Sequence, residues 1–223
     1  MSQFAGMNIS AQAGANATQG AQAYISHYSP RICSSSEVGV GSSSVWSMMA
    51  NTAAGNPGWD LAQVGWLKLQ SWNTSTPLYF YEWEDVGTNN GPQQLGTVPN
   101  PTDTAIQDDF TVYTDGSGAT HFMINGVDQI TPIPLNWYAN AVEYDGEIHN
   151  PVDQIAGDTG DLAYFSGIQK LYNGTWYSDT ADNSDTVNTT TYGGMYLNNP
   201  QNNGFQIWDT RYFCDDINNS ACG

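Results

Sequence analysis

The stretch Leu78-Tyr79-Phe80-Tyr81-Glu82-Trp83-Glu84 decides the fold class, because its aromatic residues favour a β-strand. Similar short runs recur on both sides of it, separated by turn signals such as Asn125-Gly126, a dipeptide typical of tight hairpins. The chain contains no convincing amphipathic helix pattern. We therefore expect an all-β fold, an antiparallel β-sandwich of the jelly-roll or concanavalin-like type with long loops. Further strands are expected at residues 44–50, 61–70, 110–113, 120–124, 127–133, 137–144, 163–171, 194–197 and 205–208.

The domain organisation is expected to be simple. Residues 1–23 are rich in Ala, Gln, Asn and Gly and predict an extended N-terminal segment, followed by a single sandwich domain over residues 24–223. Such a segment could pair with a neighbouring subunit and build a homo-oligomer or filament. Two long loops are expected, a proline-containing one at residues 87–109 and an Asp/Asn/Thr-rich one at residues 177–192, which is either a surface loop or a lid.

The composition narrows the classes of partner. The 223 residues carry 22 acidic and only 4 basic side chains, a formal net charge of −18. Phosphate binding requires clustered Lys and Arg, so neither nucleic acid nor an anionic membrane surface is an expected partner. There is no apolar run of about 18 residues, and residues 1–23 lack the basic and apolar regions of a signal peptide. The amide-rich, weakly charged composition is typical of secreted, extracellular β-proteins.

Cysteine and histidine give no metal-site pattern. Of the three cysteines, Cys214 could pair with either Cys222 or Cys33, which leaves one thiol over in both cases. The three histidines lie far apart in sequence, so no metal site and no cofactor are expected. Weak calcium binding by the Asp-rich residues 179–185 remains an alternative.

Two strand positions could carry chemistry. Gln63 lies two residues before Gly65 in an otherwise apolar run, and Glu147 directly follows Gly146. The glutamine amide can polarise a carbonyl, and the glutamate can move a proton. Alternation along a strand also places Glu143 on the face of Glu147. An alternative reading makes Asp145-Gly146 a hairpin turn, which would put Glu147 at the start of the next strand.

These residues resemble the glutamic peptidases of the eqolisin type and the related neprosin group. The resemblance rests on Gln63-x-Gly65, the aromatic strand at residues 78–84 and a later strand glutamate, with further similarity at residues 154–157 and 164–169. It implies a Gln63/Glu147 catalytic dyad in a β-sandwich hydrolase. The segment around Glu147 departs from both family patterns, which leaves open whether Glu143 or Glu147 is the matching acid. The remaining residues expected to contact substrate are Trp66, Tyr81, Trp83, Glu82 and Glu143.

The resulting hypothesis is a secreted peptidase that acts at acid pH, near the ordinary carboxyl pKa of about 4.3. Its substrate would be a peptide. Three other functions are compatible with the sequence: a glycoside hydrolase using facing carboxylates, a self-assembling subunit, and a non-catalytic sandwich that binds polysaccharide. The tryptophans considered for sugar binding are Trp59, Trp72, Trp137 and Trp176.

Overall fold

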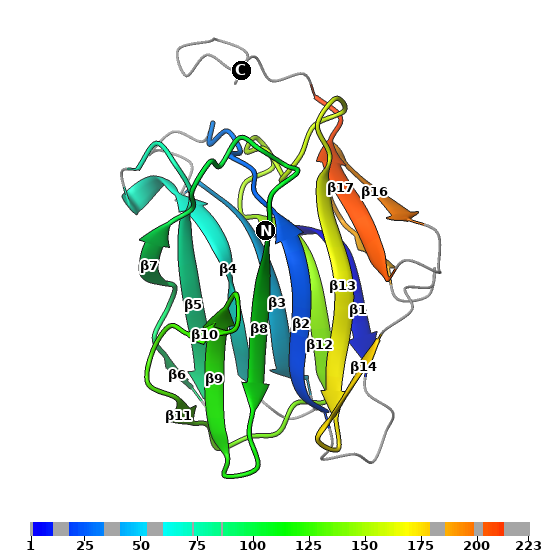
Figure 1. Cartoon of the computed structure of the whole chain (residues 1–223). Coiled ribbons are helices and arrows are strands. Elements are labelled where there is room, and N and C mark those ends of the chain that lie inside the picture. Colours follow the sequence, from blue (N-terminus) through cyan, green and yellow to red (C-terminus); the bar gives the residue numbers. More distant parts are fainter. Residues whose placement is uncertain are drawn as a thin grey trace.

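Two antiparallel sheets stack face to face in the computed structural model of the chain (Figure 1). The structure describes residues 2–10, 18–33, 41–52, 60–72, 74–85, 87–178, 186–198 and 203–211. Nearly all regular structure in these ranges is β-strand; one 3-10 turn, Gln70–Trp72, follows a strand end. The predicted all-β sandwich is confirmed. Among the described residues, no helix is long and apolar enough to cross a bilayer.

The first sheet has eight strands and carries the predicted glutamine and glutamates. Its order is β15 (Thr186–Asn188), β1 (Gln3–Ser10), β12 (Ala141–Ile148), β3 (Ser42–Asn51), β4 (Asp60–Leu69), β5 (Leu78–Asp85) and β6 (Thr88–Asn89), with β7 (Gln93–Thr97) also paired to β5.

The second sheet has nine strands and faces the viewer in Figure 1. Its order is β10 (Val127–Asp128), β9 (Ala119–Ile124), β8 (Gln107–Thr114), β2 (Thr18–Ser26), β13 (Ala163–Tyr172), β17 (Gly204–Asp209) and β16 (Gly193–Asn198); β11 (Ile133–Pro134) pairs with β9, and β14 (Thr175–Ser178) pairs with β13.

The N-terminal residues contribute one strand to each sheet, whereas the sequence predicts an extended segment over residues 1–23 ahead of the sandwich domain. β1 pairs with β12 on one side and with β15 on the other, and β2 lies between β8 and β13. Buried side chains at alternate positions explain why the segment can form strands: Ala5 and Met7 of β1, and Ala21 and Ala23 of β2, are fully buried in the core. Residues 5–7 of β1 are paired on both sides within the chain, so this part of the strand is not open to a strand from a neighbour.

β12 runs without interruption from Ala141 to Ile148, so Asp145-Gly146 is not a hairpin turn. It starts four residues later than expected and continues further. The Asn125-Gly126 hairpin is confirmed, with both residues at positive φ. The long loop at residues 87–109 contains the short strands β6 and β7. The Asp-rich residues 179–185 lie outside the described ranges.

The main core fills the space between the sheets, and a second cluster lies on the outer side of the eight-stranded sheet. The main core includes Trp66, Phe110, Phe165 and Phe205. The second cluster contains Trp46, Met48, Ala50, Leu67 and Phe80. This cluster shields part of the outer face of the sheet from water, and the predicted catalytic residues lie around it.

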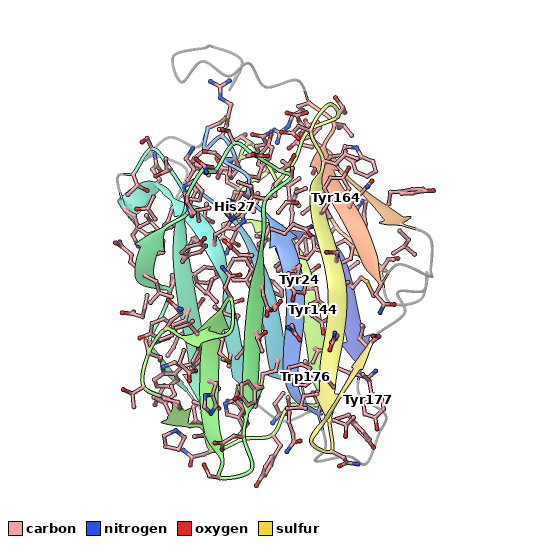
Figure 2. The ribbon with its side chains drawn as sticks, viewed as in Figure 1. Tyr24, His27, Tyr144, Tyr164, Trp176 and Tyr177 are labelled. Atoms are coloured by element: carbon pink, nitrogen blue, oxygen red, sulfur yellow. The ribbon has the colours of Figure 1, made fainter. Side chains whose placement is uncertain are left out.

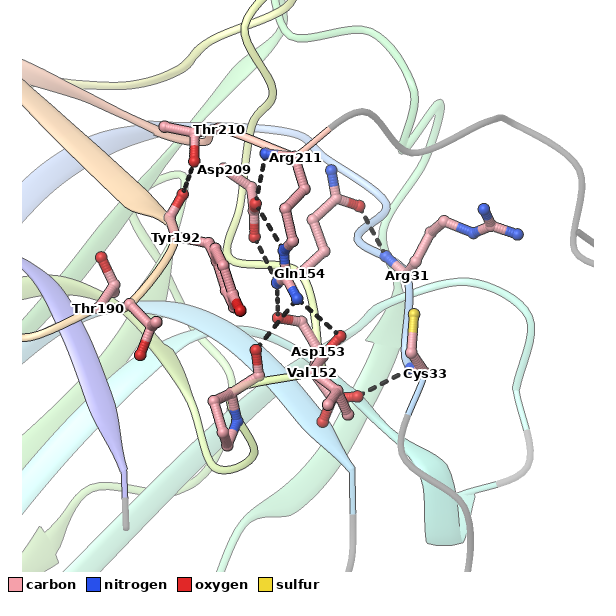
Figure 3. Close-up of polar contacts among 12 residues, drawn as sticks. Arg31, Cys33, Val152, Asp153, Gln154, Thr190, Tyr192, Asp209, Thr210 and Arg211 are labelled. Atoms are coloured by element: carbon pink, nitrogen blue, oxygen red, sulfur yellow. Dashed lines mark hydrogen bonds and ion pairs between the residues drawn. The ribbon is translucent and has the colours of Figure 1, made fainter. Parts of the chain in front are cut away.

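A polar network joins the loops at one end of the sandwich (Figure 3). The Arg211 guanidinium donates to Asp209 Oδ2 at 2.7 Å and to the Asp153 carbonyl at 2.7 Å, and it lies 4.5 Å from the centre of the Tyr192 ring. Buried Asp153 in turn accepts from the backbone N–H groups of Cys33 and Ser42. Cys33 is disulfide-bonded, while Cys214 and Cys222 lie outside the described residues.

Gly65 allows close approach between β4 and β3. A Cβ at this position would lie 1.9 Å from the Val45 carbonyl oxygen and 2.8 Å from Trp46 Cα. Both contacts are to backbone, which cannot move aside as a flexible side chain can. The glycine of the Gln63-x-Gly65 pattern is therefore required by packing.

We expect Gly65→Ala to lower the free energy of unfolding by about 1–3 kcal/mol, because β3 and β4 must separate locally to admit the methyl group. Urea unfolding followed by tryptophan fluorescence measures the change. Gly116→Ala is the control, since a Cβ there meets nothing within 4 Å. Equal unfolding midpoints for the two variants would contradict the packing argument.

Candidate active site

One row of side chains crosses the outer face of the eight-stranded sheet. Cross-strand pairing aligns Asn8 with Glu143, Glu143 with Met48, Met48 with Gln63, and Gln63 with Glu82. Directly opposed residues of antiparallel strands point to the same face, so these five side chains stand side by side. Residues far apart in sequence thus meet in one row: position 8, position 143 and position 63.

Hydrogen bonds hold both ends of this row. Gln63 Nε2 donates to Glu82 Oε2 at 2.8 Å, and Asn8 Nδ2 donates to Glu143 Oε1 at 2.9 Å. An amide nitrogen carries two N–H groups, so Gln63 keeps one donor beyond the bond to Glu82. Both the glutamine and the glutamate are oriented by a neighbour on the adjacent strand.

A pocket of about 220 Å³ lies above the row. Polar and apolar side chains both line it: Phe4, Asn8, Trp46, Met48, Leu61, Gln63, Glu143, Asp145, Glu147 and Val187. Drug-sized ligand sites are usually larger, about 300–1,000 Å³, so this pocket has room for a side chain and one backbone group of a larger substrate.

Three carboxyl groups from β12 enter the pocket in line. Glu143, Asp145 and Glu147 are two residues apart, and alternation turns all three to the outer face. The predicted acid Glu147 lies four residues along the strand from the Gln63 row, and it forms an ion pair of 2.9 Å with His149 Nε2. Glu143, which the resemblance left as the alternative, is the acid in register with Gln63.

Burial shifts the proton affinity of these acids. It raises the pKa of Glu143 to about 7, with a further increase from the negative charge of Glu147. The pKa of Asp145 is raised well above its ordinary value, first by burial and then by the charges of Glu143 and Glu147. Burial also raises the pKa of Glu82, although the hydrogen bond from Gln63 opposes this. The site therefore retains protons that exposed carboxyl groups would lose.

Two buried polar atoms in the pocket have no hydrogen-bond partner among the described residues. They are Asp145 Oδ1 and Trp46 Nε1, and the two residues are direct cross-strand partners. An unpaired buried polar group destabilises a protein unless something binds it. Both atoms are shielded from solvent, which fits the raised pKa of Asp145.

The three aromatic residues expected to line the cleft do not line this pocket and lie in or against the main core instead. Trp66 is fully buried in the main core, where its indole N–H donates to the Ser26 carbonyl at 3.0 Å. Tyr81 packs on Phe122 with ring centres 5.2 Å apart, and Trp83 packs against the same core. The reason is alternation: Trp66 is an odd number of residues from Gln63, and Tyr81 and Trp83 from Glu82.

Several pocket residues were not predicted. Asp145 was detectable, because it alternates with Glu143 and Glu147. Trp46 and Met48 lie in a strand that was predicted, but nothing in its sequence separates a pocket face from a core face. The sequence does not indicate that Asn8 and Phe4 line a pocket, because it predicts an extended segment rather than a strand at these positions. No group of three or more His, Cys, Asp or Glu side chains within the described ranges is arranged to hold a metal ion.

A second buried ionisable group lies between the sheets. His27 is fully buried and 2.6 Å from Asp108 Oδ2, and Asp108 also accepts from Tyr79 and from Asn125 Nδ2. Burial disfavours the charged imidazole, but the hydrogen bond and charge of Asp108 outweigh this and raise the pKa of His27. Burial would raise the pKa of Asp108, but its hydrogen bonds lower it to about 2.

We expect the free energy of unfolding to fall as pH rises from about 4.5 to 8. The folded state binds the Glu143 proton more tightly than the unfolded state, so this stability is present below the unfolded pKa and is lost as pH passes through the folded pKa of about 7. The raised pKa of His27 acts in the same direction, and the lowered pKa of Asp108 protects the fold down to about pH 2. The Glu143 contribution is on the order of 3 kcal/mol.

Glu143→Gln tests this assignment. The variant should be more stable than the original protein at pH 8 and close to it at pH 4, as measured by chemical unfolding at each pH. Glu84→Gln, which removes a carboxylate outside the pocket, is the matched control. Parallel pH profiles for the original protein and Glu143→Gln would show that Glu143 is not the group responsible.

Comparisons with known proteins bear on the fold. No protein-family model matches the chain, and no curated protein does. Among solved structures, it is similar to SCP-B, a member of the eqolisin family of peptidases in complex with the tripeptide Ala-Ile-His: TM-score 0.56, 11% identity, covering 94% of this chain and 98% of that one. A native glycosidic hydrolase also matches, with a TM-score of 0.37, 9% identity and coverage of 65% and 64%, too weak to carry an argument. The resemblance stated from the sequence is confirmed for the fold, and the chain has the β-sandwich architecture of an eqolisin peptidase.

Proposed function

We propose that the protein is a glutamic-peptidase-like hydrolase whose catalytic pair is Gln63 and Glu143. The observation that carries the proposal is their shared row across one pocket, with each side chain held by its own hydrogen bond. Their strands are separated by β3 alone, roughly 10 Å between backbones. The Gln63 and Glu143 side chains extend toward each other over β3. The gap that remains between them suits a water molecule and a substrate carbonyl above Met48.

The mechanism follows from the two side chains. The Glu143 carboxylate takes a proton from the water, and the water oxygen attacks the carbonyl carbon. The second N–H of Gln63 stabilises the oxyanion that forms, while Glu82 fixes the amide orientation. Protonated Glu143 then gives its proton to the leaving amine as the C–N bond breaks.

The rest of the pocket suggests how a peptide would lie. Phe4, Trp46 and Leu61 offer an apolar surface for a substrate side chain. Asn8, Gln63 and Glu143 supply the polar groups that would meet the main chain of a peptide. Secretion remains part of the proposal. It is supported by the acidic composition, in which only 12% of residues are charged, and by the disulfide bond at Cys33.

We expect Gln63→Ala and Glu143→Gln each to reduce casein hydrolysis by about 100-fold or more, because each removes a group that acts in the transition state. Fluorescent casein assayed from pH 3 to 7 measures the rate, and Glu84→Gln is the control. Loss of activity in Glu147→Gln with an active Glu143→Gln would transfer the acid role to Glu147. Full activity in Gln63→Ala would refute the pair.

The pH profile gives a separate prediction. Because the pKa of Glu143 is raised to about 7, its base form becomes abundant only near neutral pH, so activity should extend above the pH 3–4 expected from an ordinary carboxyl group. Glu147→Gln removes a negative charge that raises this pKa, and we expect the acid limb of kcat/KM to move to lower pH. An unchanged limb would show that Glu147 does not influence the catalytic acid.

A further inference from the structure

The outer face of the nine-stranded sheet carries a line of aromatic side chains on the side of the sandwich opposite the pocket. Figure 2 looks onto this face and shows Tyr164, Tyr24 and Trp176 following the length of β2 and β13. Cross-strand pairing gives the same order: Tyr24 is opposite Asp109 and Ser166, and Trp176 is opposite Leu171, which is opposite Gly20.

Tyr24 lies next to the backbone of β13. It is 42% exposed, and its ring edge is so close to Gly167 that a Cβ there would lie 2.8 Å from Cδ2. Gly167 has a positive φ of 57° and lies at the register shift in β13. Because glycine has no side chain, the edge of the Tyr24 ring can approach the backbone here while much of the side chain remains exposed.

A second aromatic group lies four residues further along β2. Tyr113 stacks on His121 with ring centres 4.5 Å apart, and it meets Trp176 edge-on at 6.2 Å. Gly20 lies between Tyr113 and Leu171 in the same row, where a Cβ would come 2.4 Å from Tyr113 Cβ. Gly20 itself is buried, and the absence of a side chain there leaves room for the Tyr113 and Trp176 rings to contact each other.

Hydrogen-bonding side chains fill the row between the two aromatic groups. Gln22 is opposite both Gln169 and Thr111, and its Nε2 donates to Asp109 Oδ2 at 2.9 Å. Each glutamine has a carbonyl acceptor and two N–H donors, so the row retains both kinds of group for a ligand. Hydroxyl groups, which donate and accept, match such a surface.

The charge of this face further restricts the class of ligand that it can bind. The rows described here contain Asp109 but no Lys or Arg, because alternation turns Lys170 away from the face of Gln169 and Leu171. The whole chain has a net charge of −18, which repels anionic polymers. Single-stranded nucleic acid, which also stacks on aromatic rings, would find no cation for its phosphates here.

We propose that this face binds a neutral β-1,4-linked polysaccharide, with sugar rings packed on Tyr24 and on Trp176. The apolar faces of pyranose rings pack on aromatic rings, and an extended β-1,4 chain presents those faces along its length. The two aromatic positions are four residues apart on β2, roughly 13 Å, so a chain of several sugars follows the strands. Sugar hydroxyls then reach Gln22 and Gln169.

Trp176 is the one tryptophan on this face among the sugar-binding candidates that the structure describes. Trp137 is buried in the main core, and Trp72 packs against the second apolar cluster. Trp59 lies outside the described residues.

Native affinity electrophoresis in gels containing hydroxyethyl cellulose tests the proposal, with cellohexaose titration calorimetry giving Kd. The original protein should be retarded, and Tyr24→Ala and Trp176→Ala should each weaken binding at least 10-fold. Tyr138→Ala removes an exposed tyrosine in the loop before β12, outside these rows, and should bind as the original does. Polygalacturonate, an anionic polymer, should cause no retardation. Melting curves of all variants show whether each remains folded.

Absence of retardation of the original protein would overturn the proposal, as would equal binding by the original, Tyr24→Ala and Trp176→Ala. A dimer in light scattering that Tyr24→Ala dissociates would also overturn it, because a second copy would then cover this face. Casein hydrolysis is measured on the same variants; since the pocket lies on the other sheet, its outcome is independent of polysaccharide binding.

Discussion

The alternation of side chains across β12, β3, β4 and β5 is the constraint on which the site depends. β12 pairs with β3 over eight residues and β3 with β4 over ten, both without a register shift. Each side chain of these strands can therefore point to only one face of the sheet. A slip of one residue between β12 and β3 would send Glu143 into the core and bring Val142 to the surface. The long, uninterrupted pairing of these central strands therefore has more effect on which side chains meet in the pocket than any single hydrogen bond within it.

Burial at this site acts on both stability and reactivity. The apolar cluster around Trp46 and Phe80 removes water from the carboxyl groups of Glu143 and Asp145, which makes their ionised forms costly. The same exclusion strengthens the interaction of any remaining N–H group with developing negative charge. A site of this kind is least stable when its acids are ionised, and ionised acid is what a general base requires.

Much of the fold could be predicted from the sequence, because aromatic and β-branched strands with hairpin signals are local features. The strands at residues 78–84 and 163–171 are examples. β1 and β2 could not be found this way, since Ala, Gly and Gln have low intrinsic strand preference and these strands form only because neighbours on both sides pair with them. Residue type and resemblance predict Gln63 and Glu147 as the pair, with Glu143 as the alternative acid. The proposal of Glu143 in place of Glu147 rests on the strand register, which the sequence does not give. The positions of the aromatic residues show that alternation must be applied within each strand before a residue is assigned to a cleft.

The position of β1 has a consequence for how the chain reaches its folded state. This strand is made first, yet its partners are residues 141–148 and 186–188. Contacts so distant in sequence close slowly, because a long loop must be ordered before pairing stabilises it. During synthesis β1 remains without its partner β12 until residues 141–148 have been made, so Asn8 can meet Glu143 only after the strands that carry Met48, Gln63 and Glu82. Assembly of this row therefore waits for its most distant strand, β12.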